Sequence, residues 1–321
     1  MSRGQTTVLV TGGAGFIGSH LVDGLLRDGH YRVRALDNFV TGLRENLAHC
    51  LRDIDLVEGD VRELETVDLA VDGIDCILHE AALPSVSRSV KAPITSNDVN
   101  VGGTLNLLSA GRKAGVKRFI LASSSSVYGD ARELPKTETM TPRPMSPYAV
   151  SKLAAEHYCR VFGELYGIET VSLRYFNVFG PRQDPRSQYS GVISRFITNT
   201  LAGQPNTVNG DGKQSRDFTY VDNVVAANLA ALKCERLSGE PINVACGERR
   251  TLLDVIEVLR SLSGKDHPIT HTEARAGDVR HSQASIERAA ALLGFHPTVP
   301  FPEGLRRTYD WYEAAPAERR R

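Results

Sequence analysis

The chain has 321 residues, of which 41% are hydrophobic and 24% are charged, as in ordinary globular proteins. This composition excludes intrinsic disorder and collagen-like repeats, and the length suggests about two domains or one large fold with an added lobe. Lys plus Arg and Asp plus Glu each total 38, so the net charge is zero. The chain therefore has no overall positive field to hold nucleic acid or an anionic membrane, and neither is expected as a partner.

Targeting and redox features are sparse. No apolar run approaches the roughly 20 residues that a membrane helix needs. The polar segment 1–7 lacks the long apolar region of a signal peptide. The five cysteines are dispersed and odd in number, and they form no Cys-x-x-Cys motif, so they indicate neither a disulfide framework nor a zinc site. We expect a cytoplasmic location and no bound metal.

Residues 8–18 read as a strand, a glycine turn and the start of a helix, with Gly12, Gly15 and Gly18 spaced three apart. Glycines at this spacing permit a tight turn, close approach of the backbone to a pyrophosphate and close packing of helix on strand. The helix then offers free N–H groups and its positive dipole end to the phosphates. This pattern predicts dinucleotide binding; the alternative is a purely structural turn.

The first half of the chain continues this alternation of strands and helices. Strands are predicted at 8–10, 33–36, 54–57, 76–79, 119–122 and 170–175, and helices at 19–28, 100–114 and 147–166. Such alternation favours βαβ units and a parallel sheet. The helix 147–166 is well delimited, because Ser146 can cap it, Pro147 suits its first turn and Gly167 can end it.

The second strand ends in Asp37 and Asn38. An acid at this position can hydrogen-bond both ribose hydroxyls of a dinucleotide and would repel a 2′-phosphate, so it favours NAD over NADP. The alternative is a solvent-facing turn residue. Asp60 and Val61 follow the third strand, where they can meet the adenine.

Tyr148 and Lys152 begin the long helix at i, i+4 spacing, which places them on one face. A tyrosine has a pKa near 10, and a lysine ammonium and a cationic nicotinamide ring would both favour its phenolate. Tyr148 is therefore a candidate base. Ser123 to Ser126 follow a strand, at the sheet edge where ligands bind in doubly wound folds. A hydroxyl there can share a hydrogen bond with a substrate oxygen.

From Phe179 onward a polar loop, 180–191, precedes helices predicted at 192–201, 221–233, 252–261 and 285–293 and a strand at 242–245. The sequence thus predicts an α/β fold. A Rossmann-type, doubly wound parallel sheet is expected in residues 1–178. A smaller C-terminal α/β substrate lobe is expected mainly in residues 179–321, with the chain able to cross between the two.

Eight motifs distributed over nearly the whole chain resemble the extended short-chain dehydrogenases/reductases, and among them the nucleotide-sugar 4-epimerases of the UDP-glucose/UDP-N-acetylglucosamine type. They are Thr11–Gly18, His79–Ala82, Asn100–Thr104, Ser123–Gly129, Tyr148–Lys152, Arg174–Pro181, Arg216–Asp222 and Arg275–Ser282.

The resemblance implies a role for each matching residue. NAD would be held by Gly12, Gly15, Phe16, Ile17, Gly18, Asp37, Asn38, Asp60, Val61, Ala81, Ala82, Asn100, Tyr148, Lys152 and Tyr175, with Tyr175 on the nicotinamide side. The catalytic residues would be Ser124, Tyr148 and Lys152. A UDP-sugar would be bound by Ser85, Ser124, Ser125, Tyr148, Asn177, Val192, Phe196, Val208, Arg216, Arg275, Asp278 and Ser282. Of these, Asn177, Arg216 and Arg275 would hold the diphosphate region, Asp278 the uridine ribose, and Phe196 and Val208 the uracil.

The implied reaction is an oxidation at C4 of the sugar, rotation of the 4-keto sugar about its diphosphate link, and hydride return to the other face. Tyr148 would take the 4-hydroxyl proton while Ser124 relays it. Related dehydratases carry an Asp-Glu pair where this chain has Ser125 and Ser126, and related decarboxylases carry a Glu at position 126. The sequence therefore indicates an epimerase that neither dehydrates nor decarboxylates.

Two alternatives stay open. A UDP-glucuronate 4-epimerase is possible because Arg88, Arg182 and Arg186 could serve a carboxylate. A non-catalytic NAD- or nucleotide-sugar-binding protein of the same fold is the alternative from a different class, since fold does not fix function.

Ser282 bears on the choice of sugar. In family members that exclude N-acetyl sugars, the corresponding position can carry a tyrosine facing the sugar's 2-substituent. A serine leaves room for an acetamido group, so UDP-N-acetylglucosamine and UDP-N-acetylgalactosamine are the expected substrates, with UDP-glucose and UDP-galactose as a possible second pair. The alternative is that Ser282 is merely a small loop residue.

A homodimer is also implied, formed by helices 100–114 and 147–166 of each copy. Its candidate apolar contacts are Leu105, Leu108, Leu153 and Val161, which could equally belong to the intrachain core.

Overall fold

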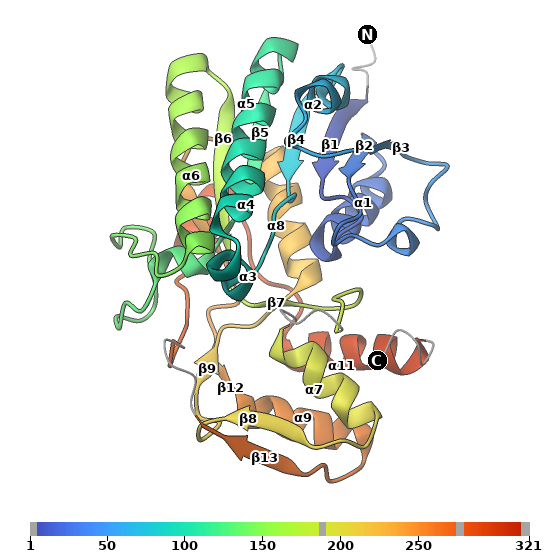
Figure 1. Cartoon of the computed structure of the whole chain (residues 1–321), viewed down its shortest axis with the longest axis vertical. Coiled ribbons are helices and arrows are strands. Elements are labelled where there is room, and N and C mark those ends of the chain that lie inside the picture. Colours follow the sequence, from blue (N-terminus) through green and yellow to red (C-terminus); the bar gives the residue numbers. More distant parts are fainter. Residues whose placement is uncertain (1–4, 186–190, 274–278, 316–321) are drawn as a thin grey trace.

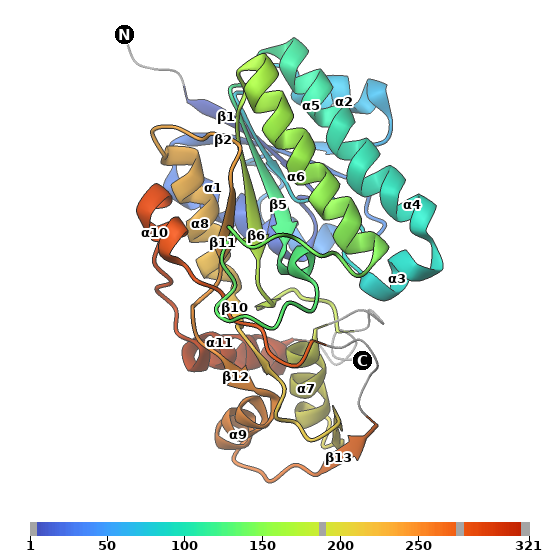
Figure 2. The same ribbon diagram turned by 90° about the vertical axis from the view of Figure 1, so that its left-hand side faces the viewer.

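Seven parallel strands form the centre of the protein, in the order β3-β2-β1-β4-β5-β6-β11. Figure 1 labels β1 to β6 of this sheet, and Figure 2 labels β11. The computed structural model describes residues 5–185, 191–273 and 279–315. The strands are β1 (Thr6–Thr11), β2 (Tyr31–Asp37), β3 (Asp55–Glu58), β4 (Cys76–His79), β5 (Arg118–Ser124), β6 (Glu169–Tyr175) and β11 (Pro241–Val244). The chain reverses its direction of travel across the sheet between β1 and β4, which is where ligands bind in such sheets. The predicted doubly wound sheet is confirmed.

Helices cover both faces of this sheet (Figure 2). One layer contains α1 (Phe16–Asp28), α8 (Val221–Lys233) and α10 (Glu287–Leu293), and the other contains α2 (Leu64–Val71), α5 (Gly103–Ala114) and α6 (Pro147–Tyr166). Side chains alternate between the two resulting cores, since Val8 and Val10 of β1 face the first layer and Leu9 faces the second. Burial on both faces explains why these strands are almost continuously apolar.

The long helix α6 has the boundaries that its sequence predicts. Its N-cap Ser146 accepts a hydrogen bond from the Ala149 N–H at 3.1 Å, and Gly167 ends it with a positive φ of 75°. The helix expected at 100–114 differs, because α3 (Val86–Lys91), α4 (Pro93–Asn97) and a π-helical turn (Asp98–Gly102) lead into α5. None of the helices in the described ranges has the length and apolar character to cross a bilayer.

A second lobe lies beyond the carboxyl ends of the strands (Figures 1 and 2). It packs α7 (Val192–Leu201), α9 (Leu252–Ser263) and α11 (Phe301–Ala314) around an aromatic core that includes Phe179, Phe218 and Phe301. Three two-stranded ladders complete it: β7 (Val178–Phe179) with β10 (Thr219–Tyr220), β9 (Ser215–Arg216) with β12 (Arg250–Thr251), and β8 (Asn206–Asn209) with β13 (Ile269–Thr272).

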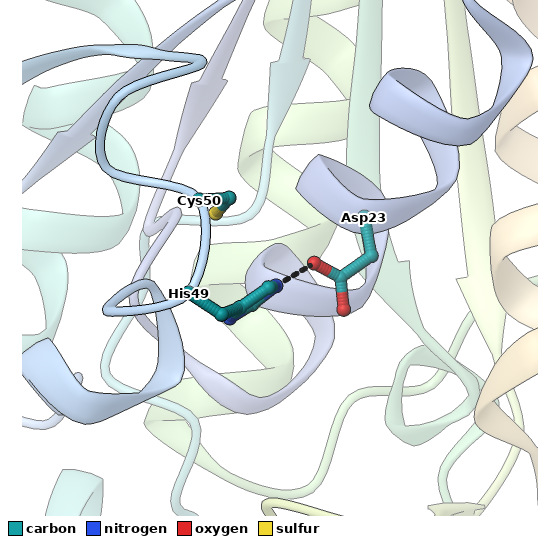
Figure 3. A group of neighbouring side chains, drawn as sticks. All are labelled: Asp23, His49 and Cys50. Carbon is teal, nitrogen blue, oxygen red and sulfur yellow. Dashed lines mark hydrogen bonds and ion pairs between the residues drawn. The ribbon is translucent and has the colours of Figure 1, made fainter.

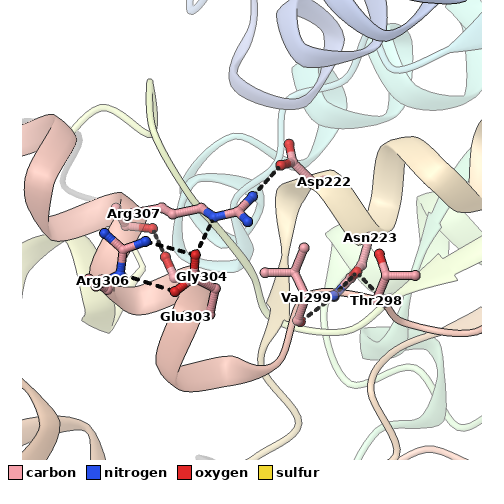
Figure 4. A network of polar contacts seen from close by, with 9 residues as sticks. Asp222, Asn223, Thr298, Val299, Glu303, Gly304, Arg306 and Arg307 are labelled. Carbon is pink, nitrogen blue, oxygen red and sulfur yellow. Dashed lines mark hydrogen bonds and ion pairs between the residues drawn. The ribbon is translucent and has the colours of Figure 1, made fainter.

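The chain crosses between the lobes, because α8, β11 and α10 return to the sheet. A polar network joins α8 to the start of α11 (Figure 4). The buried Asn223 side chain accepts bonds from the Thr298 and Val299 N–H groups, both at 3.0 Å, and donates one to the Val299 carbonyl at 2.8 Å. Beside it, Arg307 of α11 reaches Asp222 of α8 at 3.4 Å. These bonds hold the second lobe against the sheet layer.

Candidate active site

The glycine turn after β1 has room for backbone only. Gly12 has a φ of +67°, and a Cβ placed there would come within 2.9 Å of the Ala81 nitrogen. A Cβ on Gly18 would collide with the carbonyl of Gly12. The N-cap of α1, Gly15, supplies no side-chain acceptor to the first turn of the helix, which Phe16 and Ile17 begin. The first turn of α1 therefore presents its N–H groups beside a turn without side chains, which fits a pyrophosphate.

Asp37 is fixed at the end of β2. Its carboxylate accepts bonds from the Ala14 N–H at 2.9 Å and the Phe39 N–H at 2.8 Å, and only 7% of the residue is exposed. Burial raises the pKa of Asp37, whereas the backbone bonds lower it. A Cβ on Gly42 would lie 2.8 Å from either carboxylate oxygen, so the loop after β2 closes tightly over this group. The ribose acceptor expected from the sequence is thus held next to the phosphate turn.

The residues expected at the adenine lie beside Asp37. Asn38 donates to the Asp60 carboxylate at 2.8 Å, and Val61 is buried. The guanidinium of Arg62 bonds Asp60 at 2.7 Å and lowers the pKa of that carboxyl to about 2. Asp60 is therefore an anion that anchors Asn38.

Hydrogen bonds attach the segment after β4 to β1 on one side and, through Asn100, to α6 on the other. Ala81 and Ala82 are partly exposed there, and the Ala81 N–H donates to the Thr11 hydroxyl at 3.2 Å. The buried Asn100 accepts from the Leu83 N–H at 2.8 Å and donates to Ser151 of α6 at 2.9 Å. Asn100 thus fixes this segment against the helix that carries Tyr148.

Ser124, Tyr148 and Lys152 come together at the carboxyl end of β5. Lys152 donates to the Ala122 carbonyl at 2.8 Å. Burial raises the pKa of Tyr148 to about 12, although a hydrogen bond with Ser124 lowers it. Burial also lowers the pKa of the Lys152 ammonium. The sequence led us to expect that Lys152 and a cationic nicotinamide ring together ease ionisation of the tyrosine. In the protein alone, burial dominates and the phenol stays protonated.

A buried ion pair behind these three residues was not anticipated. Both nitrogens of a guanidinium edge of Arg174 contact Glu156, at 2.9 and 2.7 Å, and Ser123 donates to the same carboxylate at 2.5 Å. Arg174 is 2% exposed and Glu156 is 6% exposed. Glu156 lies one helical turn after Lys152, while Ser123 immediately precedes Ser124. The signal available in the sequence was a lone carboxylate on the apolar face of α6.

A cavity of about 250 Å³ opens in the second lobe. Three residues expected at the substrate line it, namely Asn177, Val192 and Arg216, together with Asn209, Gln214 and Phe218, which sequence reasoning did not single out. Phe196 and Val208 do not line it. They are 2% and 0% exposed and pack into the core of the lobe.

Ser282 lies on a segment that runs along β9. Its N–H donates to the Ser215 carbonyl at 3.0 Å, and the Ser215 hydroxyl bonds His281 at 2.8 Å. Because Ser215 and Arg216 are consecutive, Ser282 is held close to an arginine of the cavity. Arg275 and Asp278 lie outside the described residues.

Buried Asp217 anchors this segment. Its carboxylate accepts from the N–H groups of Cys246 at 2.9 Å, Gly247 at 3.0 Å and Ala284 at 3.1 Å. Burial raises its pKa to about 6 even with these three donors. The residue therefore ties the Ser282 segment to the end of β11.

Two further serines expected at the substrate have different settings. Ser85 is buried and caps α3, accepting from the Arg88 N–H at 2.9 Å. Ser125 is partly exposed at the start of the short 3-10 turn Ser125–Tyr128 that follows β5. Ser125 is therefore partly accessible, whereas the Ser85 hydroxyl is buried and accepts a bond from the backbone.

Two of the three arginines considered for a sugar carboxylate lie in the described residues, and of these Arg88 lies on α3. Arg182 pairs with Asp23 of α1 at 2.8 Å, and Arg186 lies outside the described residues. Asp23 also bonds His49 at 2.7 Å, next to Cys50 (Figure 3). The potential ligand atoms of these three residues lie within 4.8 Å of one another, but the guanidinium already neutralises the carboxylate, so we assign no cation there.

Residues 8–245 match the NAD dependent epimerase/dehydratase family. The UDP-N-acetylglucosamine 4-epimerase of Methanobrevibacter ruminantium, solved with UDP-N-acetylmuramic acid, is 37% identical, with a TM-score of 0.92 over 97% of this chain and 99% of that one. The UDP-glucose 4-epimerase of Thermus thermophilus, solved with NAD, is 40% identical, with a TM-score of 0.89 over 97% and 100%. The UDP-glucuronic acid 4-epimerase of Bacillus cereus, solved with UDP-glucuronic acid and NAD, is 35% identical, with a TM-score of 0.88 over 95% and 98%.

Proposed function

Because the chain belongs to the NAD dependent epimerase/dehydratase family, we propose that it interconverts UDP-N-acetylglucosamine and UDP-N-acetylgalactosamine, with UDP-glucose and UDP-galactose as a second pair. That the protein is an isomerase and uses NAD follows from the family and its full-length relatives. The choice of sugar is our proposal. It rests on one observation: Ser282, a small residue, occupies the segment held against β9 beside Arg216.

The glycine cradle supports a specific placement of NAD. The turn at Gly12 and Gly18 would hold its pyrophosphate, Asp37 its adenosine ribose, and Tyr148 and Lys152 its nicotinamide ribose. When bound, NAD accepts a hydride from C4 of the sugar and returns it to the opposite face. The protein supplies orientation and proton transfer.

Tyr148 Oη is the proposed site of proton transfer. It would take the proton of the sugar 4-hydroxyl and later return it, with the Ser124 hydroxyl relaying or orienting that proton. Burial holds the pKa of the phenol near 12 in the protein alone. The positive charges of the oxidised nicotinamide and of Lys152 oppose this, so proton removal is coupled to the presence of the cofactor.

Rotation of the 4-keto sugar requires that UDP, and not the sugar, be the anchored part. The cavity supports this, because Arg216 and the N-terminal end of α7 line it, and a guanidinium and a helix N-terminus are both suited to a diphosphate. Uncharged Ser125 and Ser126 supply no carboxylate for elimination. Arg182 is paired with Asp23, which disfavours a uronate as the substrate. UDP-glucuronate is the alternative substrate, and every assay should include it.

Replacing Tyr148 with Phe keeps the ring and removes the proton acceptor. We expect turnover of UDP-sugars to fall by about 10²–10⁴-fold, because general acid–base groups contribute that much. NAD should stay bound to the purified variant, because the glycine turn, Asp37 and Lys152 still hold it, and this serves as the control for folding. Near-normal turnover would move the base elsewhere, most simply to Ser124.

Replacing Ser282 with Tyr fills the space that an acetamido group would take. We expect the variant to lose activity on the N-acetylated pair by about tenfold or more and to retain it on the plain hexoses, since an overfilled pocket discriminates by size. Ser282→Ala is the matched control: it keeps the space and should keep both activities within a few-fold. A wild type that ignores N-acetyl sugars, or a tyrosine variant that still turns them over, contradicts the assignment.

The proposal includes a homodimer. Of the apolar residues suggested by the sequence, Leu108 is fully buried, and Leu105 and Leu153 pack against the cores of their own chain. An exposed apolar surface nevertheless remains over α3, α4 and α6, where Val90, Ile94 and Val150 are 64%, 76% and 52% exposed. A cytoplasmic location likewise stays a prediction.

Sedimentation tests the dimer. Wild type at micromolar concentration should sediment as a dimer, and Ile94→Lys combined with Val150→Glu should sediment as a monomer, because charges would be buried in the contact. Leu292→Glu on α10, at the other face of the sheet and 45% exposed, is the control and should stay dimeric. A monomeric wild type would refute the dimer.

A further inference from the structure

One carboxylate at the reversal point of the sheet has no part in the reaction described above. Glu80 directly follows β4, and its oxygen Oε1 lies 2.7 Å from the hydroxyl of Tyr175 at the end of β6. Its backbone N–H donates to the Thr11 carbonyl at 3.2 Å. Glu80 thus lies between the glycine turn and the end of β6, where the family resemblance implies that Tyr175 is on the nicotinamide side.

The direction of the bond between Tyr175 and Glu80 is determined by Asn228 of α8. The Asn228 amide nitrogen lies 2.9 Å from the Val224 carbonyl, which can only accept, and 2.8 Å from the Tyr175 hydroxyl. The amide therefore donates to the hydroxyl, and the single proton of Tyr175 is left for Glu80. Asn228 is fully buried and Tyr175 is 7% exposed, so this chain of bonds holds the carboxylate in one position.

Charged and titratable groups face Glu80 from several elements. Lys152 and Tyr148 of α6 are near enough for its charge to act on both: it favours the Lys152 ammonium and raises the pKa of Tyr148. His79, the residue before it, is buried between two threonine hydroxyls, and burial lowers its pKa, so it is neutral. The other carboxylate near Lys152, Glu156, is already paired.

We propose that Glu80, oriented by Tyr175 and Asn228, is the counter-charge to the oxidised nicotinamide ring and sets how readily the bound cofactor is reduced. The oxidised ring is cationic and the reduced ring is neutral, so a nearby carboxylate stabilises the oxidised form selectively. Restraining reduction keeps the cofactor ready for the next sugar. The proposal depends on NAD binding and not on which sugar is the substrate.

The effect is pH-dependent, with a definite sign. Burial raises the pKa of Glu80 above its ordinary value, while the Tyr175 bond and the Lys152 charge lower it. As the pH falls through this raised pKa, Glu80 takes up a proton and its charge is lost. The restraint on reduction is therefore complete in alkaline solution and absent in acid.

The test is a redox titration of the holoenzyme, saturated with NAD and UDP, against a dye couple of known potential at a series of pH values. The absorbance of the bound cofactor gives its reduced-to-oxidised ratio. In alkaline solution we expect the reduced-to-oxidised ratio of Glu80→Gln to be about tenfold higher than that of wild type. This corresponds to about 1.4 kcal/mol of interaction between the carboxylate and the oxidised ring. In acid the two proteins should converge.

Two further variants make the outcome decisive. Glu164→Gln makes the same change on the exposed face of α6, where Glu164 pairs with Arg160, and should match wild type throughout. Tyr175→Phe keeps the carboxylate but removes the bond that lowers its pKa, so the pH at which the restraint disappears should move upward. If Glu80→Gln fails to fold or to hold NAD, this shift decides the question. An unchanged ratio in Glu80→Gln, or an unmoved pH dependence in Tyr175→Phe, overturns the proposal; a purely structural role would lower NAD content without either change.

Discussion

The arrangement of the site depends on the buried ion pair between Glu156 and Arg174. It joins three elements at their functional ends, because Arg174 precedes Tyr175 on β6, Glu156 follows Lys152 on α6, and Ser123, which shares the carboxylate, precedes Ser124 on β5. Removing one partner of such a pair leaves an uncompensated buried charge and costs about 3–5 kcal/mol. The hydroxyl, phenol and ammonium are therefore held in register by a contact that none of them makes.

Burial around this pair sets the proton chemistry. It raises the pKa of the Tyr148 phenol and lowers the pKa of the Lys152 ammonium, so both groups tend toward neutrality in the protein alone. A bound cation would oppose the effect of burial on the phenol and favour its ionised form. Proton removal from a sugar hydroxyl would then wait for a complete complex, which protects the site from unproductive ionisation. Glu80 adds a negative charge to the same small volume, and this is why its ionisation state matters to the cofactor.

Local chemistry made much of the fold predictable. The glycine turn, the cap at Ser146 and the end at Gly167 are each fixed by neighbouring residues, and the structure places them as expected. The helix Phe301–Ala314 was missed, and the helix expected to start at Asn100 begins instead after a π-helical turn. Both depend on how the second lobe and α6 pack, which no short window of sequence contains.

The site residues likewise divide into those that the sequence predicts and those that it does not. Motif residues such as Asp37 and Arg216 could be picked out because their spacing from strands and glycines carries meaning. Glu80 and Glu156 are single carboxylates without a pattern, and their importance lies in partners 95 and 18 residues away, Tyr175 and Arg174. Phe196 and Val208 show the converse. Each is next in sequence to a residue that lines the cavity, but its own side chain packs into the core of the second lobe.

The central claim is that the protein epimerises UDP-sugars by oxidation and re-reduction at C4 with its own NAD. The most direct measurement uses a UDP-sugar deuterated at C4, incubated with the holoenzyme in ordinary water, with the product examined by NMR. We predict that the product keeps the deuterium at C4, because the hydride leaves and returns without meeting solvent. Replacement of the deuterium by solvent hydrogen would contradict this and point to proton abstraction from carbon.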